Sequence, residues 1–207
     1  MTEKFTQEFW DERYRSRNHL WSGKPNPHLV GHVSGLGGGT ALDVGSGEGA
    51  EAIWLAERGW WVTALDVSTV ALERGASHAA EAGVDVARRI NWLHEDLMIW
   101  KGPEPDSYDL VTSQFLHLPK EPRESLFRRL AASVSPGGTL LIVGHHPSDL
   151  QPETLREMAE LCFTASEVAA LLDPDEWEII VEASVERPTI NPGGHTHDAV
   201  LKARRRD

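Results

Sequence analysis

From residue 41 onward, short apolar runs alternate with segments of helical periodicity, and this alternation limits the fold more than any other feature. The expected strands are 41–44, 61–65, 90–93, 108–113 and 139–143. The expected helices are 50–58, 69–82, 122–134 and 164–172. Ser68 and Gly83 are expected to cap the second of these helices. Such alternation predicts an α/β fold, a mostly parallel sheet with helices on both faces.

The two ends of the chain depart from this alternation. Strands are also expected at 177–185 and 197–203, and they are expected to pair antiparallel because no helix separates them. Residues 1–40 are expected to form one or two helices, a lid over the ligand edge of the core formed by 41–207. No Pro- or Ser-rich linker divides the chain, so residues 1–207 are expected to form a single domain.

The charge balance and the chain ends limit the partners. Twenty basic and 32 acidic residues give a net charge of −12, which argues against nucleic acid and anionic membranes as partners. The start of the chain lacks the features of a signal peptide, and no apolar stretch approaches the roughly 18 residues of a membrane span. The single cysteine, Cys162, requires no oxidising compartment. We therefore expect a cytoplasmic monomer or homodimer.

A glycine-rich turn, LDVGSGEG at 42–49, follows the first expected strand and opens a helix. Glycines let a ligand approach the backbone, and the N–H groups at the start of the helix then point at it. Asp66 ends the next strand, 21 residues after Gly45, where its carboxylate can bond both hydroxyls of a ribose. These features predict a nucleoside site; the alternative is a tight turn with a helix-capping aspartate. The glycine spacing is not that of the dinucleotide fingerprint, and no P-loop is present.

This glycine-rich turn resembles the first motif of the class I S-adenosylmethionine-dependent methyltransferases. The resemblance covers about 41–145 and continues through GWWVTALDVS at 59–68, LHEDL at 93–97, YDLVTSQFLHL at 108–118 and SPGGTLLIVG at 135–144. It implies a Rossmann-like seven-stranded sheet in the order 3-2-1-4-5-7-6, with the last strand antiparallel. The segment 9–30 is similar to a small-molecule branch that includes tellurite-resistance (TehB-like) and thiopurine methyltransferase-like enzymes.

The resemblance implies S-adenosylmethionine as the cofactor and indicates which residues contact it. In the motifs these are Gly45, Ser46, Gly47, Gly49, Asp66, Val67, Asp96, Leu97, Ser113 and Gln114. The residues of 45–49 would line the methionine and ribose part, Asp66 would hold the ribose, and Val67 would lie beside the adenine. Asp96 would accept a bond from the adenine amino group and Leu97 would pack on the ring. Residues 113–114 would face the methionine moiety.

Three aromatic residues of the leading segment are candidates for a lid over the cofactor. Trp10 and Tyr14 are four residues apart and so share one helix face, and Trp21 follows. An aromatic face suits a sulfonium cation, and a closing lid excludes water. The alternative is a packing role that holds the N-terminal helix to the rest of the chain.

Five of the ten histidines fall where active-site loops are predicted. His117 follows the fourth expected strand, His145 and His146 follow the fifth, and His195 and His197 lie in the last hairpin. Imidazole is well suited to proton transfer near neutral pH, so one reading is a general base acting on a hydroxyl, thiol or ring N–H. His117 and His146 are the favoured bases and His145 is the next. The alternatives are ordinary loop histidines or a metal site; because the spacing fits no metal motif, no metal is expected.

The segment after the fourth expected strand narrows the substrate. Amino-directed nucleobase methyltransferases carry Asn/Asp-Pro-Pro-Tyr there, whereas this chain has SQFL at 113–116, without the carboxylates of magnesium-dependent catechol enzymes. The prediction is methyl transfer to a small molecule at O, S or N by in-line displacement, with O or S favoured. Three alternatives stay open: methylation of tellurite or selenium species, a nicotinamide-dependent oxidoreductase, and a non-catalytic cofactor-binding protein.

Overall fold

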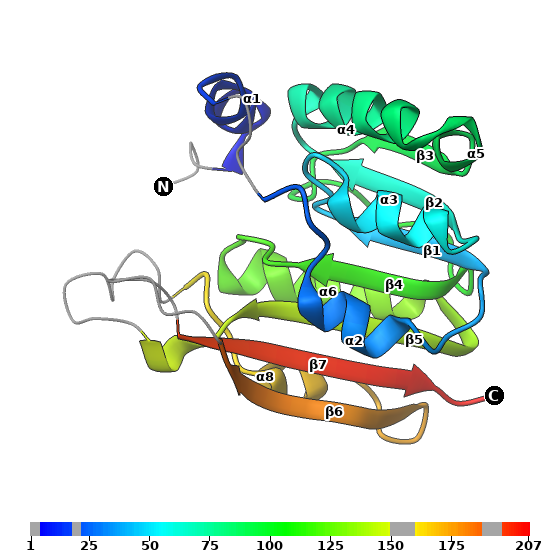
Figure 1. The fold of residues 1–207 in the computed structure, drawn as a ribbon. Coiled ribbons are helices and arrows are strands. Elements are labelled where there is room, and N and C mark those ends of the chain that lie inside the picture. Colours follow the sequence, from blue (N-terminus) through cyan, green and yellow to red (C-terminus); the bar gives the residue numbers. More distant parts are fainter. Residues whose placement is uncertain (1–4, 18–21, 150–159, 188–195) are drawn as a thin grey trace. The chain divides into compact units, whose positions relative to one another are not determined.

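The strands form one sheet in the computed structural model, which describes residues 5–17, 22–149, 160–187 and 196–207. These strands are β1 (Thr40–Val44), β2 (Trp61–Asp66), β3 (Ile90–His94), β4 (Tyr108–Gln114), β5 (Val134–His145), β6 (Trp177–Glu186) and β7 (His197–Arg205). Their order is β3-β2-β1-β4-β5-β7-β6 (Figure 1). β1 pairs in parallel with β2 and β4, whereas β7 pairs antiparallel with β5 and β6. The predicted order and the antiparallel ending are both confirmed.

The helices also follow the expected pattern. They are α1 (Gln7–Arg15), α2 (Pro27–Val33), α3 (Ala50–Glu57), α4 (Thr69–Ala82), α5 (Val84–Ala87), α6 (Lys120–Ala132) and α8 (Ala165–Ala169). The bounds and both caps of α4 are confirmed, since Ser68 Oγ accepts from Ala71 N and Gly83 ends the helix at φ +135°. Residues 1–40 contribute two helices, as expected. No described helix, not even the 14-residue α4, is long and apolar enough to cross a bilayer.

Two expected boundaries were wrong. β5 begins at Val134, so the Pro136-Gly137-Gly138 run lies inside the strand and does not precede it. The pairing of β5 with β7 begins only at Thr139, after this run. A proline, which has no N–H to donate, is therefore tolerated at this position. The helix expected at 164–172 is shorter, Ala165–Ala169, and begins with a capping box between Thr164 and Glu167. The short helix α5 was not expected.

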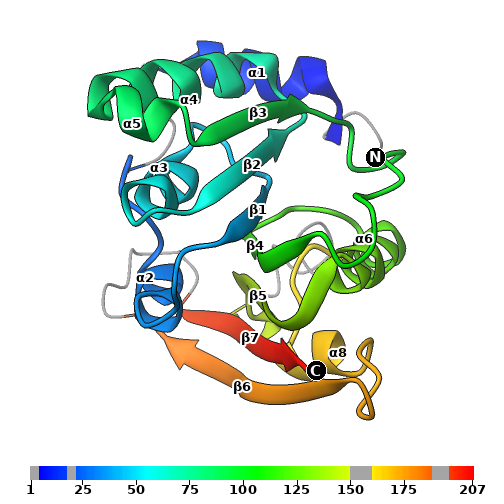
Figure 2. The ribbon, with the colours of Figure 1, turned by 90° about the vertical axis from the view of Figure 1, so that its right-hand side faces the viewer.

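The chain divides into two compact units. Unit 1 contains residues 1–101 and 110–113, and unit 2 contains residues 102–109 and 114–207. In unit 1, α3 packs on β2 and α4 packs on β3 (Figure 2), around fully buried leucines at 42, 55 and 65. In unit 2, α6 packs on β5 and α8 packs on β6 and β7, around fully buried leucines at 126, 140 and 201. That the chain is a single domain stays a prediction.

Candidate functional site

The glycine-rich turn connects β1 to α3 in a left-handed backbone conformation. Gly45, Gly47 and Gly49 have φ angles of +73°, +53° and +83°. The N–H groups of Gly45 and Ser46 both donate to Leu65 O, at 2.9 and 3.0 Å, which ties the turn to β2. A Cβ on Gly49 would lie 2.3 Å from Cη2 of Trp92, so this position requires glycine for space as well as for its backbone angle.

Asp66 lies at the end of β2 and is bonded to the glycine-rich turn. Its Oδ2 accepts from Gly47 N at 2.9 Å, and its Oδ1 accepts from Ser68 N at 2.9 Å. Burial raises the pKa of Asp66, although these backbone donors oppose the shift. Each carboxylate oxygen can accept a second hydrogen bond, so the geometry is compatible with the predicted contacts to a ribose. The residue therefore also has a structural function, because it holds two buried backbone donors.

Two buried polar atoms of the turn have no hydrogen-bond partner among the described residues. They are Asp43 Oδ2 and Ser46 Oγ. Burial, reinforced by the neighbouring carboxyl groups of Glu51 and Asp66, raises the pKa of Asp43 well above its usual value. Leaving a buried polar atom unpaired costs about 1–3 kcal/mol, so both atoms are suited to a polar ligand. Asp43 was not among the predicted site residues, although a lone acid in an apolar strand was a visible signal.

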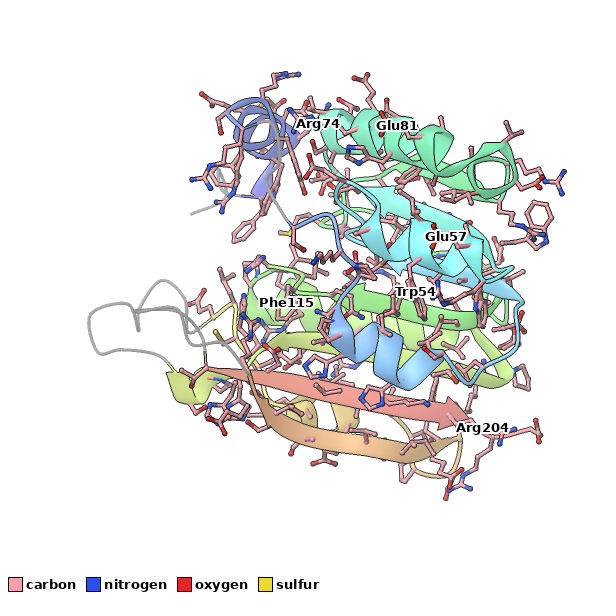
Figure 3. The ribbon with its side chains drawn as sticks, viewed as in Figure 1. Trp54, Glu57, Arg74, Glu81, Phe115 and Arg204 are labelled. Atoms are coloured by element: carbon pink, nitrogen blue, oxygen red, sulfur yellow. The ribbon has the colours of Figure 1, made fainter. Side chains whose placement is uncertain are left out.

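Glu48, within the turn, is held by an ion pair that the sequence did not predict. Arg74 of α4, which is labelled in Figure 3, donates from Nη1 to Glu48 Oε1 at 2.9 Å. The same nitrogen lies 3.0 Å from Arg17 O, just beyond α1. Glu48 is buried and Arg74 is partly exposed. Arg74 therefore links the turn, α4 and the N-terminal segment.

The N-terminal helix α1 is fastened to the first turn of α4. Asp11 is buried and accepts from Ser68 Oγ at 2.6 Å and from Val70 N at 3.2 Å. Burial tends to raise the pKa of Asp11, but these hydrogen bonds outweigh it and lower the pKa below its usual value. The rings of Trp10 and Tyr14 lie 6.3 Å apart on this helix, and Tyr14 is only 3% exposed. Trp21 lies outside the described residues.

The other predicted cofactor residues also have structural contacts. Asp96 Oδ1 accepts from Met98 N at 2.9 Å, Leu97 is buried, and Ser113 Oγ donates to Val44 O at 3.1 Å. The carbonyl of Val67 accepts from Nε2 of His94 at 3.0 Å, a histidine to which no role was assigned. All of these residues lie in unit 1, whereas Gln114 is half-buried in unit 2.

Unit 2 brings together two of the three predicted bases. The ring centroids of His117 and His145 lie 5.5 Å apart, and Phe115 lies 4.7 Å from His145. The guanidinium of Arg187 lies 4.8 Å from the Phe115 ring, and its Nη2 lies 3.4 Å from Nδ1 of His145. Phe115 and Arg187 were not predicted, because their proximity depends on how the hairpin of β6 and β7 packs beside β5.

The third predicted base, His146, is engaged in a local turn. Its Nδ1 accepts from Ser148 N at 3.2 Å and lies 2.8 Å from Ser148 Oγ. A backbone N–H can only donate, so the proton of the neutral ring is placed on Nε2. His195 lies outside the described residues. Within the described ranges, no three His, Cys, Asp or Glu side chains are grouped as a metal site would require.

Comparison with known protein sequences identifies a methyltransferase segment. Residues 41–138 match the methyltransferase domain family. The chain is 38% identical over 108 residues to an uncharacterized methyltransferase of Mycobacterium tuberculosis, covering 52% of this chain and 51% of that protein. It is 27% identical over 191 residues to a 2-heptyl-1-hydroxyquinolin-4(1H)-one methyltransferase of Mycobacteroides abscessus, covering 82% of each. The chain spans about half the length of the first curated relatives it matches.

Solved structures show the same fold. A 1,6-didemethyltoxoflavin-N1-methyltransferase of Burkholderia thailandensis superposes with a TM-score of 0.70 at 19% identity, covering 97% of this chain and 87% of that chain. An S-adenosylmethionine-dependent methyltransferase of Mesorhizobium loti gives a TM-score of 0.66 at 22% identity, covering 86% and 96%. The chain therefore has the methyltransferase fold, and its residues 41–138 match the model of the methyltransferase domain family.

Proposed function

We propose that this chain is an S-adenosylmethionine-dependent methyltransferase that acts on a small-molecule acceptor. The observation that carries the proposal is the pair of buried, unpartnered polar atoms in the glycine-rich turn, Asp43 Oδ2 and Ser46 Oγ. They lie in the segment that matches the methyltransferase domain family, next to the bond between Asp66 and Gly47 N. A ligand with an ammonium group and ribose hydroxyls supplies the donors that these atoms lack.

The charges of unit 1 support a cationic ligand. Burial raises the pKa values of Asp43, Glu51 and Asp66, and the carboxyl groups of Glu51 and Asp66 both act on Asp43. A nearby positive charge favours the ionised form of such groups and so offsets part of the cost of burying them. S-adenosylmethionine carries two positive charges, on its sulfonium sulfur and its α-ammonium group. The residues present therefore fit this cofactor.

The proposed chemistry needs positioning more than covalent participation. When bound, the cofactor supplies a methyl group that is already activated by the positive charge on sulfur. The glycine-rich turn and Asp66 would hold and orient the donor, and in-line displacement then depends on how the acceptor is positioned. For an acceptor that begins protonated, we assign the role of base to His117 and not to His146, whose Nδ1 is engaged with Ser148.

Oxygen is the favoured acceptor atom among O, S and N. One relative is named for a hydroxyquinolinone substrate, and another is a ubiquinone biosynthesis O-methyltransferase of Pectobacterium carotovorum, 36% identical over 119 residues. Membership of the tellurite-resistance (TehB-like) branch, with tellurium or selenium as acceptor, is the second candidate and rests on the segment 9–30 alone. A cytoplasmic location, a monomeric or homodimeric state and the lack of a nucleic-acid partner stay predictions.

Calorimetry with S-adenosylmethionine, S-adenosylhomocysteine and NAD tests the cofactor. We expect both sulfur nucleosides to bind and NAD not to bind; if neither sulfur nucleoside binds, the proposal is wrong. Mass spectrometry of a panel of phenols, thiols, N-hydroxy heterocycles, tellurite and selenite then tests the acceptor. Binding without methylation of any compound favours a non-catalytic cofactor-binding protein.

A further inference from the structure

We propose that Phe115, His117, His145 and Arg187, here called the acceptor cluster, bind a planar aromatic acceptor with an ionisable hydroxyl group, such as a phenol or an N-hydroxy heteroaromatic compound. Within the cluster, His145 donates a hydrogen bond to the acceptor oxygen, and Arg187 is the positioning residue that orients this donor. The inference rests on the proposed function and deepens it by naming the substrate class.

The residues of the acceptor cluster belong to unit 2, and three of them lie at the ends of strands. Phe115 directly follows β4 (Figure 3), His145 is the last residue of β5, and Arg187 directly follows β6. Phe115 has a φ of +55°, an unfavourable angle for a residue with a large side chain, and its N–H donates to Val143 O at 2.8 Å. Such strain persists only where the surroundings impose it, and it is enriched at functional sites.

The backbone beside His145 is also closely held. Phe163 N donates to His145 O at 3.1 Å. A Cβ on Gly144 would lie 2.3 Å from Cζ of Phe163, so the phenyl ring packs directly against the strand backbone. These contacts fix the position of His145 before any ligand binds, as a preorganised hydrogen-bond donor requires.

The contact between Arg187 and His145 decides which nitrogen of the ring carries the proton. A guanidinium nitrogen can only donate, so Nη2 of Arg187, 3.4 Å away, requires a lone pair on Nδ1 of His145. The proton of the neutral imidazole then lies on Nε2. His145 is therefore a hydrogen-bond donor at Nε2 and not a base, which differs from the role that the sequence predicted for it.

The charge of Arg187 is balanced by a carboxylate. Its Nε and its Nη2 each lie 2.7 Å from Oδ1 of Asp198, which is buried. The pair therefore presents little net positive charge to a ligand, and a phosphate or carboxylate substrate gains little from it. Three aromatic rings, of Phe115, His117 and His145, lie next to this pair with neighbouring centroids 4.7 and 5.5 Å apart. They favour a flat, weakly acidic acceptor over an aliphatic or strongly anionic one.

In the proposed reaction the acceptor is methylated on its hydroxyl oxygen. A lone pair on the acceptor oxygen forms the new bond to the methyl carbon while the electron pair of the carbon–sulfur bond passes to sulfur. The hydroxyl proton of the acceptor passes to His117. A hydrogen bond from Nε2 of His145 stabilises the acceptor oxygen as an anion and so increases the fraction that can attack.

The first test measures the ring nitrogens directly and needs no variant. In protein with ¹⁵N-labelled histidine, we expect the His145 resonances to show an unprotonated Nδ1 and a protonated Nε2 at neutral pH. In Arg187→Lys, which keeps a donor and a charge, the same state is expected. In Arg187→Met we expect a mixture of the two neutral tautomers, with the proton on Nδ1 in some molecules and on Nε2 in the others. A protonated Nδ1 in the unmodified protein overturns the inference, whether or not either variant folds.

The second test separates a donor from a base. In His145→Gln, the side-chain amide places an N–H near the position of Nε2, so we expect kcat within about tenfold of the parent. In His145→Leu, no donor remains, and we expect a loss of about 10²- to 10³-fold in kcat, the size found for removing one such donor. Equal losses in the two variants overturn the donor role. Arg204→Gln is the matched control, because Arg204 lies on β7 of the same hairpin and donates to the carbonyl of Gly137 in β5.

The third test addresses the acceptor class without requiring turnover. We expect 4-nitrophenol to bind the unmodified protein and to shift the His145 resonances, and cyclohexanol, an aliphatic alcohol without an acidic hydroxyl group, to do neither. Equal binding of both compounds, or binding of phenyl phosphate tighter than 4-nitrophenol, overturns the assigned class. If no sulfur nucleoside binds, the proposed function fails, whereas the ring-nitrogen and phenol measurements still decide the acceptor cluster.

Discussion

Substitution of Asp66 by alanine is expected to lower both the stability of the protein and its affinity for the cofactor. The carboxylate accepts from Gly47 N and Ser68 N, both at 2.9 Å, and is 8% exposed. Alanine leaves two buried N–H groups unpaired, at about 1–3 kcal/mol each, or about 2–6 kcal/mol together. Removing the carboxylate also relieves the burial that raises the pKa of Asp66, so the net loss is expected near the lower end, about 2 kcal/mol.

The effect on binding is expected to be separate and measurable. If Asp66 also bonds the ribose, losing that charge-assisted bond costs a further about 1.5–3 kcal/mol, or about 10- to 150-fold in Kd. Urea denaturation of the cofactor-free protein measures the first effect, and calorimetry with S-adenosylhomocysteine below the unfolding transition measures the second. Asp66→Asn keeps one acceptor oxygen and is expected to fall between the parent and Asp66→Ala in both measurements.

Asp85→Ala provides the matched control for these measurements. Asp85 belongs to the same unit, and its side chain is 82% exposed in a surface ion pair with Arg88. Its removal is expected to change the unfolding free energy by less than about 0.5 kcal/mol. If Asp66→Ala changes stability as little as this control does, the hydrogen-bond argument is refuted. If stability falls but the Kd is unchanged, Asp66 holds the turn and does not contact the cofactor.

Three further changes test the rest of unit 1. Gly49→Ala is expected to lower the unfolding free energy, measured by urea denaturation, by more than about 2 kcal/mol. A residue with a Cβ costs about 1–2 kcal/mol in the left-handed conformation, and this Cβ would also overlap the indole ring of Trp92. Gly37→Ala is the control, because a Cβ on Gly37 would have no atom within 4 Å. Asp43→Asn is expected to become more stable relative to the parent as the pH rises above about 4. Burial raises the pKa of Asp43, so the folded parent loses stability when this carboxyl group is deprotonated. A difference in unfolding free energy between variant and parent that is constant from pH 4 to 8 contradicts this. Asp11→Asn is expected to speed amide hydrogen exchange across α1 by tenfold or more, relative to Glu12→Gln on the exposed face of the same helix.

Local patterns in the sequence predicted the elements well where a single short-range cause decides them. α4 begins and ends at the predicted residues because Ser68 and Gly83 satisfy the helix ends through contacts within four residues. β5 was predicted less well: Pro136 and two glycines indicate a break, yet the strand continues through them. Pairing partners distant in sequence decided this boundary, and local propensity does not report them.

The candidate site divides in the same way. The positions of the glycine-rich turn and of Asp66 were predictable from the local order of the elements. Each directly follows or ends a parallel strand, and the carboxyl ends of parallel strands lie at the same edge of the sheet. Arg74 was not predictable as the partner of Glu48, and neither was Asp11 as the anchor of α1, since these pairs are separated by 26 and 57 residues. Side chains so far apart meet only through packing.

The sequence by itself determined most strands and helices and the antiparallel ending, because hydrophobic periodicity and turn residues act over a few residues. The strand order was predicted from the resemblance of the sequence motifs to a known family. Only the tertiary structure decided which distant side chain faces His145. His145 and His146 look equivalent in the sequence, but one faces Arg187 and the other faces Ser148. Ser148 is only two residues from His146, whereas Arg187 is 42 residues from His145 and meets it only because the strand ends pack together.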